Sequence, residues 1–201
     1  MPVLKYSLKA DKYKKISNSF CVNEFKCNDG SDTVFISTEL VEILQKIRNH
    51  FKKPVNITSA YRTQAYNTKV GGVSNSQHTK GTAADFYINN VKCEDVAKYA
   101  EFLMPAGGGI GLYKNFVHID VRNNRSRWKN YGRQITVDGF FGYTEPKCEL
   151  ESANDIIWEL GRRIEIKDVD KAVRELEKQQ KLNSSLYWIC RKIANSQEGI
   201  I

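Results

Sequence analysis

The chain has 201 residues, of which 41% are hydrophobic and 27% are charged. This composition is ordinary for a globular protein and excludes bulk disorder, and the length allows one domain of about 150 residues with a smaller second one. The formal net charge is +8, and its surplus lies in residues 1–148, which hold 22 Lys and Arg against 13 Asp and Glu, whereas residues 149–201 hold 9 against 10.

The first third of the chain predicts an arm, a helix and a strand. The opening 15 residues carry five lysines and are typical of a loose arm or an edge strand. Residues 37–51 predict a helix, because a serine N-cap precedes apolar residues at helical spacing. Pro54 ends this helix, and residues 55–59 then alternate as a strand.

The next residues predict two more helices and three strands. The helices are expected over residues 64–70 and 96–103, and the strands over residues 81–88, 110–113 and 116–121. Only two residues separate the last two strands, which predicts a tight hairpin. Helices and strands in this mixed order predict an α+β domain with a small mixed or antiparallel sheet and flanking helices.

The remaining residues predict a linker and a helical module. Residues 132–150 contain Gly, Pro and scattered aromatics, so we interpret them as a linker that follows a first domain of residues 1–131. Residues 151–201 predict three short helices with apolar stripes. A helical domain of this size could bury a small core alone or against a second copy. We therefore expect this domain to serve either wall binding or homo-oligomerisation.

The candidate catalytic and metal-binding residues lie in two segments near expected strands. The first reads S-x-H-x-x-G-x-A-x-D and contains His78 and Asp85. A turn at Gly81 would bring His78 beside the strand that carries Asp85. Period-two alternation places Ala83 and Asp85 on one face of that strand, where the small Ala83 leaves room for the imidazole.

The second segment is the expected strand around His118. Phe116, His118 and Asp120 share one face of this strand, whereas Val117 and Ile119 form an apolar face that packs. The face with His118 is therefore available for function.

His78, Asp85 and His118 form a candidate metal site. Two imidazoles and one carboxylate are a common ligand set for catalytic zinc and leave the fourth position to water, whose pKa the ion lowers towards about 7. The plainer alternative is that each histidine is a packed or surface residue. We interpret His50 in this way, at the end of a helix whose dipole favours it.

Longer stretches of the sequence resemble a known family. They read SAYRT at 59–63, YNTKVGGVSNSQHTKGTAADF at 66–86 and GGIGLYKNFVHIDVR at 108–122. Over roughly residues 18–128, their order and separation resemble the zinc D-alanyl-D-alanine carboxypeptidase family, which includes VanX and the murein endopeptidases of bacteriophage lysins. The resemblance implies Zn2+ bound by His78, Asp85 and His118, in a small α+β fold that is shared with the hedgehog signalling domain.

The resemblance also implies roles for residues beside the metal. Arg62 matches the arginine that polarises the scissile carbonyl and stabilises the developing oxyanion, and a surface or salt-bridged arginine is the alternative. VanX-like members carry an acidic general base three positions before the last histidine, where this chain has Asn115. We expect Asp120 to replace it, either as the base or as a carboxylate that orients His118.

These assignments imply a zinc peptidase that cuts peptidoglycan. The family divides between enzymes that trim a terminal D-alanine and enzymes that cut within the stem peptide, such as at an L-Ala–D-Glu bond. The helical module and the basic first domain favour the second activity, in a phage or prophage endolysin. A D-alanyl-D-alanine carboxypeptidase is one alternative, and a zinc-containing wall-binding module without catalysis is another, because Asn115 cannot take a proton.

The net charge and the lack of a signal sequence or membrane helix predict the partners and the cellular location of the protein. A basic domain favours anionic partners, but the basic residues are scattered and no nucleic-acid recognition motif is present, so we expect peptidoglycan and anionic wall polymers instead. The first thirty residues contain no apolar run of the kind that a secretory signal needs, and no run suffices for a membrane helix. We expect storage in the host cytoplasm until lysis, with the five cysteines as reduced thiols.

Overall fold

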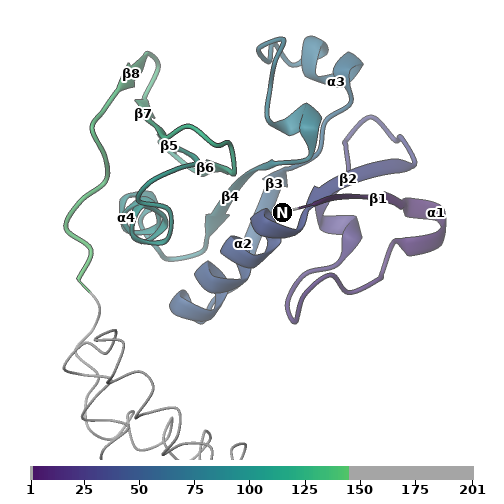
Figure 1. Ribbon diagram of the computed structural model, residues 1–201, viewed down its shortest axis with the longest axis horizontal. Helices are drawn as coiled ribbons and strands as arrows, with labels where there is room; N and C mark the ends of the chain where they lie inside the picture. Colours follow the sequence, from purple (N-terminus) through teal and green to yellow (C-terminus); the bar gives the residue numbers. More distant parts are fainter. Residues whose placement is uncertain (1, 145–201) are drawn as a thin grey trace, which may run out of the picture. The chain divides into compact units, whose positions relative to one another are not determined.

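Two β-sheets and four α-helices make up residues 2–144, the part of the chain that the computed structural model describes (Figure 1). The helices are α1 (Leu8–Asp11), α2 (Thr38–Phe51), α3 (Gln64–Lys69) and α4 (Cys93–Leu103), with short 3-10 turns η1 (Val22–Phe25) and η2 (His78–Lys80). The strands are β1 (Val3–Ser7), β2 (Thr33–Ser37), β3 (Val55–Ser59), β4 (Ala83–Ile88), β5 (Gly109–Tyr113), β6 (Val117–Asp120), β7 (Ser126–Asn130) and β8 (Gln134–Thr136). The expected α+β class is confirmed for this part of the chain.

Helix α2 is the helix that the serine N-cap predicted. The Ser37 hydroxyl accepts a hydrogen bond from the Leu40 N–H at 3.4 Å, and Lys52 ends the helix in the left-handed conformation, with φ 51. Leu40, Leu44 and Ile47 are fully buried against the core. Capping at one end and an apolar stripe along one face are therefore enough to explain this helix.

The larger sheet has the strand order β3-β4-β6-β5-β7-β8. Its neighbouring strands are antiparallel, except for β5 and β7, which run parallel. Helix α4 packs on β5 and β6, and α2 contacts both α4 and β3. The core side of the three central strands carries apolar side chains, namely Ala84, Phe86, Ile110, Leu112, Val117 and Ile119. The alternate positions therefore face away from this core, as predicted for the strand around His118.

A separate two-stranded sheet pairs β1 with β2. Strand β1 is thus an edge strand, which was one of the two expectations for the opening residues. The end of β2 also reaches the larger sheet, because the Ser37 N–H donates to the Gly81 carbonyl oxygen at 2.8 Å, directly before β4.

The larger sheet extends further along the chain than the sequence predicted. Gly132, with φ 116, lies in the turn between β7 and β8, and Phe140 joins the core with 6% exposure. The first compact unit continues to Tyr143, twelve residues past the domain end expected at residue 131. The composition of residues 132–150 indicated a linker because β8 has only three residues, all exposed, and so carries no apolar pattern of a strand.

Several expectations concern residues that the structure does not describe. The later part of the expected linker, from residue 145, and the helical domain expected at 151–201 lie outside the described residues. Within residues 2–144, no helix has both the length and the apolar character needed to cross a membrane. In that same part, Cys21, Cys27 and Cys93 are free thiols.

A buried ion pair connects α4 with β7. Arg127 is 2% exposed, and its Nε donates to Oε2 of Glu101 at 2.6 Å. The same guanidinium donates to carbonyl oxygens in residues 104–108, and so orders the glycine loop that leads into β5. Burial raises the pKa of Glu101, but hydrogen bonds from Arg127, the Phe140 N–H and Arg125 outweigh it and hold the pKa below its ordinary value.

We predict that Glu101→Gln lowers the free energy of unfolding by about 3–5 kcal/mol at pH 7, because Arg127 loses its counter-charge in the interior. The folded-state pKa of Glu101 lies below its ordinary value of 4.5. The stability advantage of the wild type is therefore fully present above pH 4.5, and it shrinks as the pH falls through the lower folded-state pKa. Urea unfolding at a series of pH values measures this difference.

Asp95→Asn is the matched control for this variant. It breaks an exposed pair with Lys98 on the same helix, where Nζ and Oδ1 lie 3.9 Å apart, and we expect a cost below about 0.5 kcal/mol. Equal losses in the two variants would contradict the assignment of the buried pair.

Candidate metal centre

A tight turn places His78 next to β4. His78 opens η2 and is 4% exposed. Gly81 ends this turn with φ 71, and a Cβ at this position would lie 2.3 Å from the carbonyl oxygen of Phe35. Only glycine therefore fits between the turn and β2, and the prediction that Gly81 brings His78 beside the strand of Asp85 is confirmed.

Asp85 and His118 are direct neighbours across β4 and β6. Opposed residues on antiparallel strands hold their Cβ atoms about 4.5–5.5 Å apart, and here His118 Nδ1 lies 2.7 Å from Asp85 Oδ1. The next position in this row is Gly111 on β5, followed by Trp128 on β7. A Cβ on Gly111 would lie 2.4 Å from the Trp128 ring, so glycine lets the indole pack beside His118, with ring centroids 5.2 Å apart.

The three predicted ligands meet at one point. His78 Nε2 lies 3.3 Å from His118 Nδ1 and 3.3 Å from Asp85 Oδ2. A tetrahedron with metal–ligand bonds of about 2.0–2.1 Å has edges of about 3.3–3.4 Å, so these two separations fit a tetrahedral zinc ion. The third, 2.7 Å between His118 Nδ1 and Asp85 Oδ1, is a hydrogen-bond distance and would have to lengthen around an ion. Within the described residues, His78, Asp85 and His118 form a group of three that could hold a metal ion.

The imidazole nitrogens that point away from the cluster, one on each histidine, are held by hydrogen bonds. His78 Nδ1 donates to the carbonyl oxygen of Ala60 at 2.7 Å. His118 Nε2 donates to Oδ2 of Asp120 at 3.0 Å. Both bonds aim the opposite ring nitrogen at Asp85, which is how ligand histidines are usually oriented.

The electrostatics of this cluster favour a cation. Burial lowers the pKa of His118, but hydrogen bonds to Asp120 and Asp85 outweigh it and raise the pKa to about 9. Burial raises the pKa of Asp85, but its hydrogen bonds with His118 and His78 bring the pKa well below its ordinary value. Two carboxylates thus stabilise positive charge at His118, and a dication would compete with the proton for Nδ1.

Asp120 lies behind His118 and does not line the cleft. Its side chain is fully buried, and Oδ1 accepts the N–H groups of Gly109 and Arg122 at 3.1 Å each. The Arg122 guanidinium holds both carboxylate oxygens, at 2.7 and 2.6 Å. Of the two roles expected for Asp120, this geometry favours orientation of His118, because the carboxylate has no exposed oxygen for a proton from water.

A cleft of about 450 Å3 opens over the cluster. It is lined by Arg62, Gly71, Gly72, Val73, Asn75, Ser76, Gln77, His78, Asp85, Tyr113, Phe116, His118, Arg122, Ser126, Trp128 and Gln134. Asp85 is the one acidic residue in this lining, and Asn115 is not part of it.

Arg62 stands at the wall of the cleft beside the cluster. Its Nη2 donates to Oδ2 of Asp85 at 2.7 Å, and its Nε donates to the Ser59 hydroxyl at 2.8 Å. The side chain keeps 17% of its surface exposed. Arg62 is therefore salt-bridged, as one alternative expected, and is also within reach of a ligand bound at the cluster.

Sequence reasoning missed three residues of the cleft wall. The Trp128 indole N–H donates to the Tyr113 hydroxyl at 3.2 Å, and Arg122 lies near the Trp128 ring, with Cζ 5.8 Å from its centroid. The alternation of β6 continues to Arg122 and could have revealed it. No comparable signal marked Trp128, because the parallel pairing of β7 with β5 is a tertiary feature.

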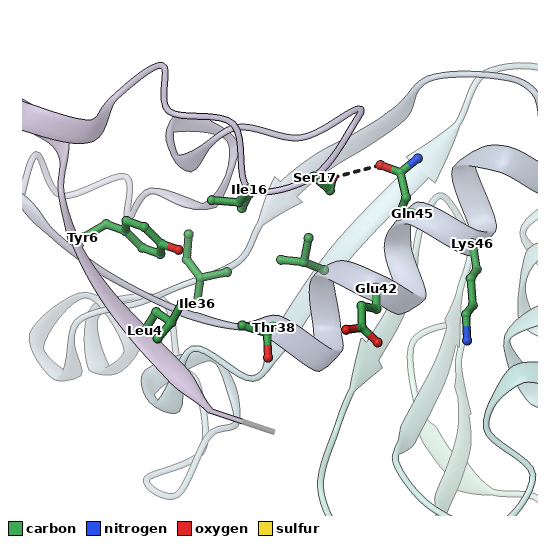
Figure 2. Close-up of a pocket in the computed structure, with 10 residues that line it drawn as sticks. Leu4, Tyr6, Ile16, Ser17, Ile36, Thr38, Glu42, Gln45 and Lys46 are labelled. Atoms are coloured by element: carbon green, nitrogen blue, oxygen red, sulfur yellow. Dashed lines mark hydrogen bonds between the residues drawn. The ribbon is translucent and has the colours of Figure 1, made fainter. Parts of the chain in front are cut away.

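A second hollow, of about 570 Å3, lies between β1 and α2 (Figure 2). Leu4, Tyr6 and Ile36 give it an apolar surface, and Ser17 donates to Gln45 at its rim, 2.8 Å away. Its lining contains Glu42 but no histidine or cysteine. The hollow therefore lacks the ligand set of the metal cluster.

Comparison with known proteins decides the family. The family model described as Peptidase M15 matches residues 18–120. The chain belongs to the peptidase M15 family. The matched segment contains His78, Asp85, His118 and Arg62.

Curated relatives match a shorter stretch. The peptidoglycan L,D-endopeptidase MepK of Escherichia coli strain K12 is 40% identical over 77 residues, which cover 35% of this chain and 41% of the relative. The MepK protein of Shigella flexneri gives the same values. This chain therefore spans less than half the length of the curated relatives that it matches.

We predict that His78→Ala and His118→Ala each lower bound zinc from about one ion per chain to below about 0.1 after dialysis, because each removes one of three ligands. His50→Ala is the control, since His50 stacks on Tyr99 at 3.8 Å and is not in the cluster. Zinc retained by His118→Ala would contradict the site.

The raised pKa of His118, about 9, predicts that zinc competes with one proton. Wild-type zinc affinity should therefore rise about tenfold per pH unit between about pH 6 and 9.

Asp120→Asn tests the orienting role. Loss of the carboxylate behind His118 should weaken zinc binding about 10–100-fold, measured by competition with a chromophoric chelator. A general base would behave differently: its loss would lower kcat and leave zinc affinity at the wild-type value.

Proposed function

We propose that this chain is a zinc-dependent peptidase that hydrolyses a stem-peptide bond of bacterial peptidoglycan. The observation that carries the proposal is the convergence of His78 Nε2, His118 Nδ1 and an Asp85 oxygen within 4.8 Å, at the surface of a cleft. Membership of the M15 family supports peptidase activity. The MepK relatives are peptidoglycan L,D-endopeptidases, which supports peptidoglycan as the substrate.

The residues around the cluster suit a hydrolytic role. Zinc bound there would polarise a peptide carbonyl and lower the pKa of a bound water. Arg62 would donate from its exposed edge to the developing oxyanion, while its bond to Asp85 Oδ2 fixes the plane of the guanidinium. The Ala60 carbonyl and the Asp120 carboxylate hold the two imidazoles in their metal-binding orientation.

We assign Asp120 an orienting role and propose no separate carboxylate base. Asn115 stands where VanX-like enzymes carry the acidic residue, and Asp85 is the one acid in the described cleft lining. Proton removal would therefore depend on the metal-lowered pKa of water, with solvent as the acceptor.

The preferred bond lies within the stem peptide, and we propose an L-Ala–D-Glu-type endopeptidase of an endolysin. The L,D-endopeptidase activity of the MepK relatives supports internal cleavage over removal of a terminal D-alanine. The net charge of +8 supports attraction to anionic wall polymers. D-alanyl-D-alanine carboxypeptidase activity is the second candidate, because the matching motifs are shared with that group.

We predict that zinc-loaded protein clears a suspension of purified Gram-positive walls, that a chelator stops clearing, and that added zinc restores it. Turbidity measures the rate, and mass spectrometry of the released peptides names the bond. His118→Ala should lose at least about 100-fold in rate, and His50→Ala should match the wild type. Zinc binding without any released peptide would instead identify a non-catalytic wall-binding module.

A further inference from the structure

A second arginine, Arg122, stands on the wall of the same cleft. Its Nε and Nη2 donate to Asp120 at 2.7 and 2.6 Å. Asp120 is fully buried, whereas the Arg122 side chain keeps 33% of its surface exposed. The guanidinium is therefore fixed along one edge and open to the cleft along the other.

The Arg122 guanidinium has N–H donors that Asp120 does not bind and that a ligand could use. A guanidinium has five N–H donors, and Asp120 takes one from Nε and one from Nη2. Among the described residues, no hydrogen-bond acceptor lies at Nη1. The Trp128 ring, 5.8 Å from Cζ, supports the cation on one side.

The charge of the cleft favours an anionic ligand. Two arginines, Arg62 and Arg122, line it, against the single carboxylate of Asp85. Asp85 is already engaged by Arg62 and both histidines. A zinc ion at the cluster would make this excess of positive charge larger.

We propose that Arg122 binds a free carboxylate of an acidic peptide substrate, carried by the residue next to the bond that is cut. A planar guanidinium pairs with a carboxylate through parallel hydrogen bonds. Arg122 is connected to His118 Nδ1, the nitrogen on the ligand side, through the Asp120 carboxylate and the His118 ring alone. One peptide residue spans about 3.3–3.6 Å, so a substrate bound at the cluster can reach Arg122 within a short stretch of chain. The inference rests on the proposed function and specifies its substrate: a γ-linked D-glutamate keeps a free α-carboxylate, whereas D-isoglutamine carries a neutral amide there.

The test compares two synthetic peptides, L-Ala-γ-D-Glu-L-Lys-D-Ala and the same peptide with D-isoglutamine, as substrates of the zinc-loaded full chain. We expect the wild type to prefer the carboxylate peptide about 10–100-fold in kcat/KM. Arg122→Gln should bring this ratio close to one. A loss caused only by misplacing Asp120 or His118 would slow both peptides equally and leave the ratio unchanged.

Lys114→Gln is the matched control, because it removes the same charge from an exposed position that does not line the cleft, and it should keep the wild-type ratio. Arg122→Lys should give an intermediate ratio, and it provides the test if Arg122→Gln fails to fold. A wild-type ratio that persists in Arg122→Gln or Arg122→Lys would overturn the inference and leave the peptidase in place. Failure of the wild type to cut either peptide or purified walls would overturn the proposed function, and the inference with it.

Discussion

The imidazole of His118 has a carboxylate at each of its nitrogens, and the rest of the site is arranged around this constraint. Asp85 lies at Nδ1 and Asp120 at Nε2, at 2.7 and 3.0 Å. Each carboxylate also has its own arginine, Arg62 for Asp85 and Arg122 for Asp120. Because both carboxylates are already neutralised, a dication at the cluster would leave the cleft positive, as binding of a carbonyl oxygen and of a peptide carboxylate requires.

Small residues in the larger sheet allow the side chains of the site to pack in fixed positions. Side chains on neighbouring strands meet in rows across the sheet, and β5 contributes glycine to both rows of the site, Gly111 beside His118 and Gly109 beside Asp120. A Cβ on Gly109 would lie 2.2 Å from an Asp120 oxygen. Packing therefore excludes most side chains there, and the buried Arg127 orders the loop before this strand.

The sequence predicted the convergence of His78, Asp85 and His118 more fully than the sheet around them. Period-two alternation and the turn at Gly81 were sufficient to bring His78 to its partners, because both are local features. The same alternation left the role of Asp120 open, since a carboxylate on the functional face can either line a cleft or support a ligand from behind. Only the contacts of Gly109 and Arg122 with Asp120 distinguish these roles. Arg122 lies two residues along the chain, but Gly109 comes from the neighbouring strand β5, whose pairing with β6 is a tertiary feature. Strands β7 and β8 were missed for a similar reason, because the parallel pairing of β7 with β5 and the pairing of β8 with β7 are tertiary features.

X-ray absorption at the zinc K-edge of the zinc-loaded protein tests the central claim most directly. The account predicts a four-coordinate ion with two imidazole nitrogens and two oxygens at about 2.0–2.1 Å, and the imidazole scattering should fall to one ring in His118→Ala. A sulfur shell at about 2.3 Å, or a site with the same two imidazoles after loss of His118, would contradict it.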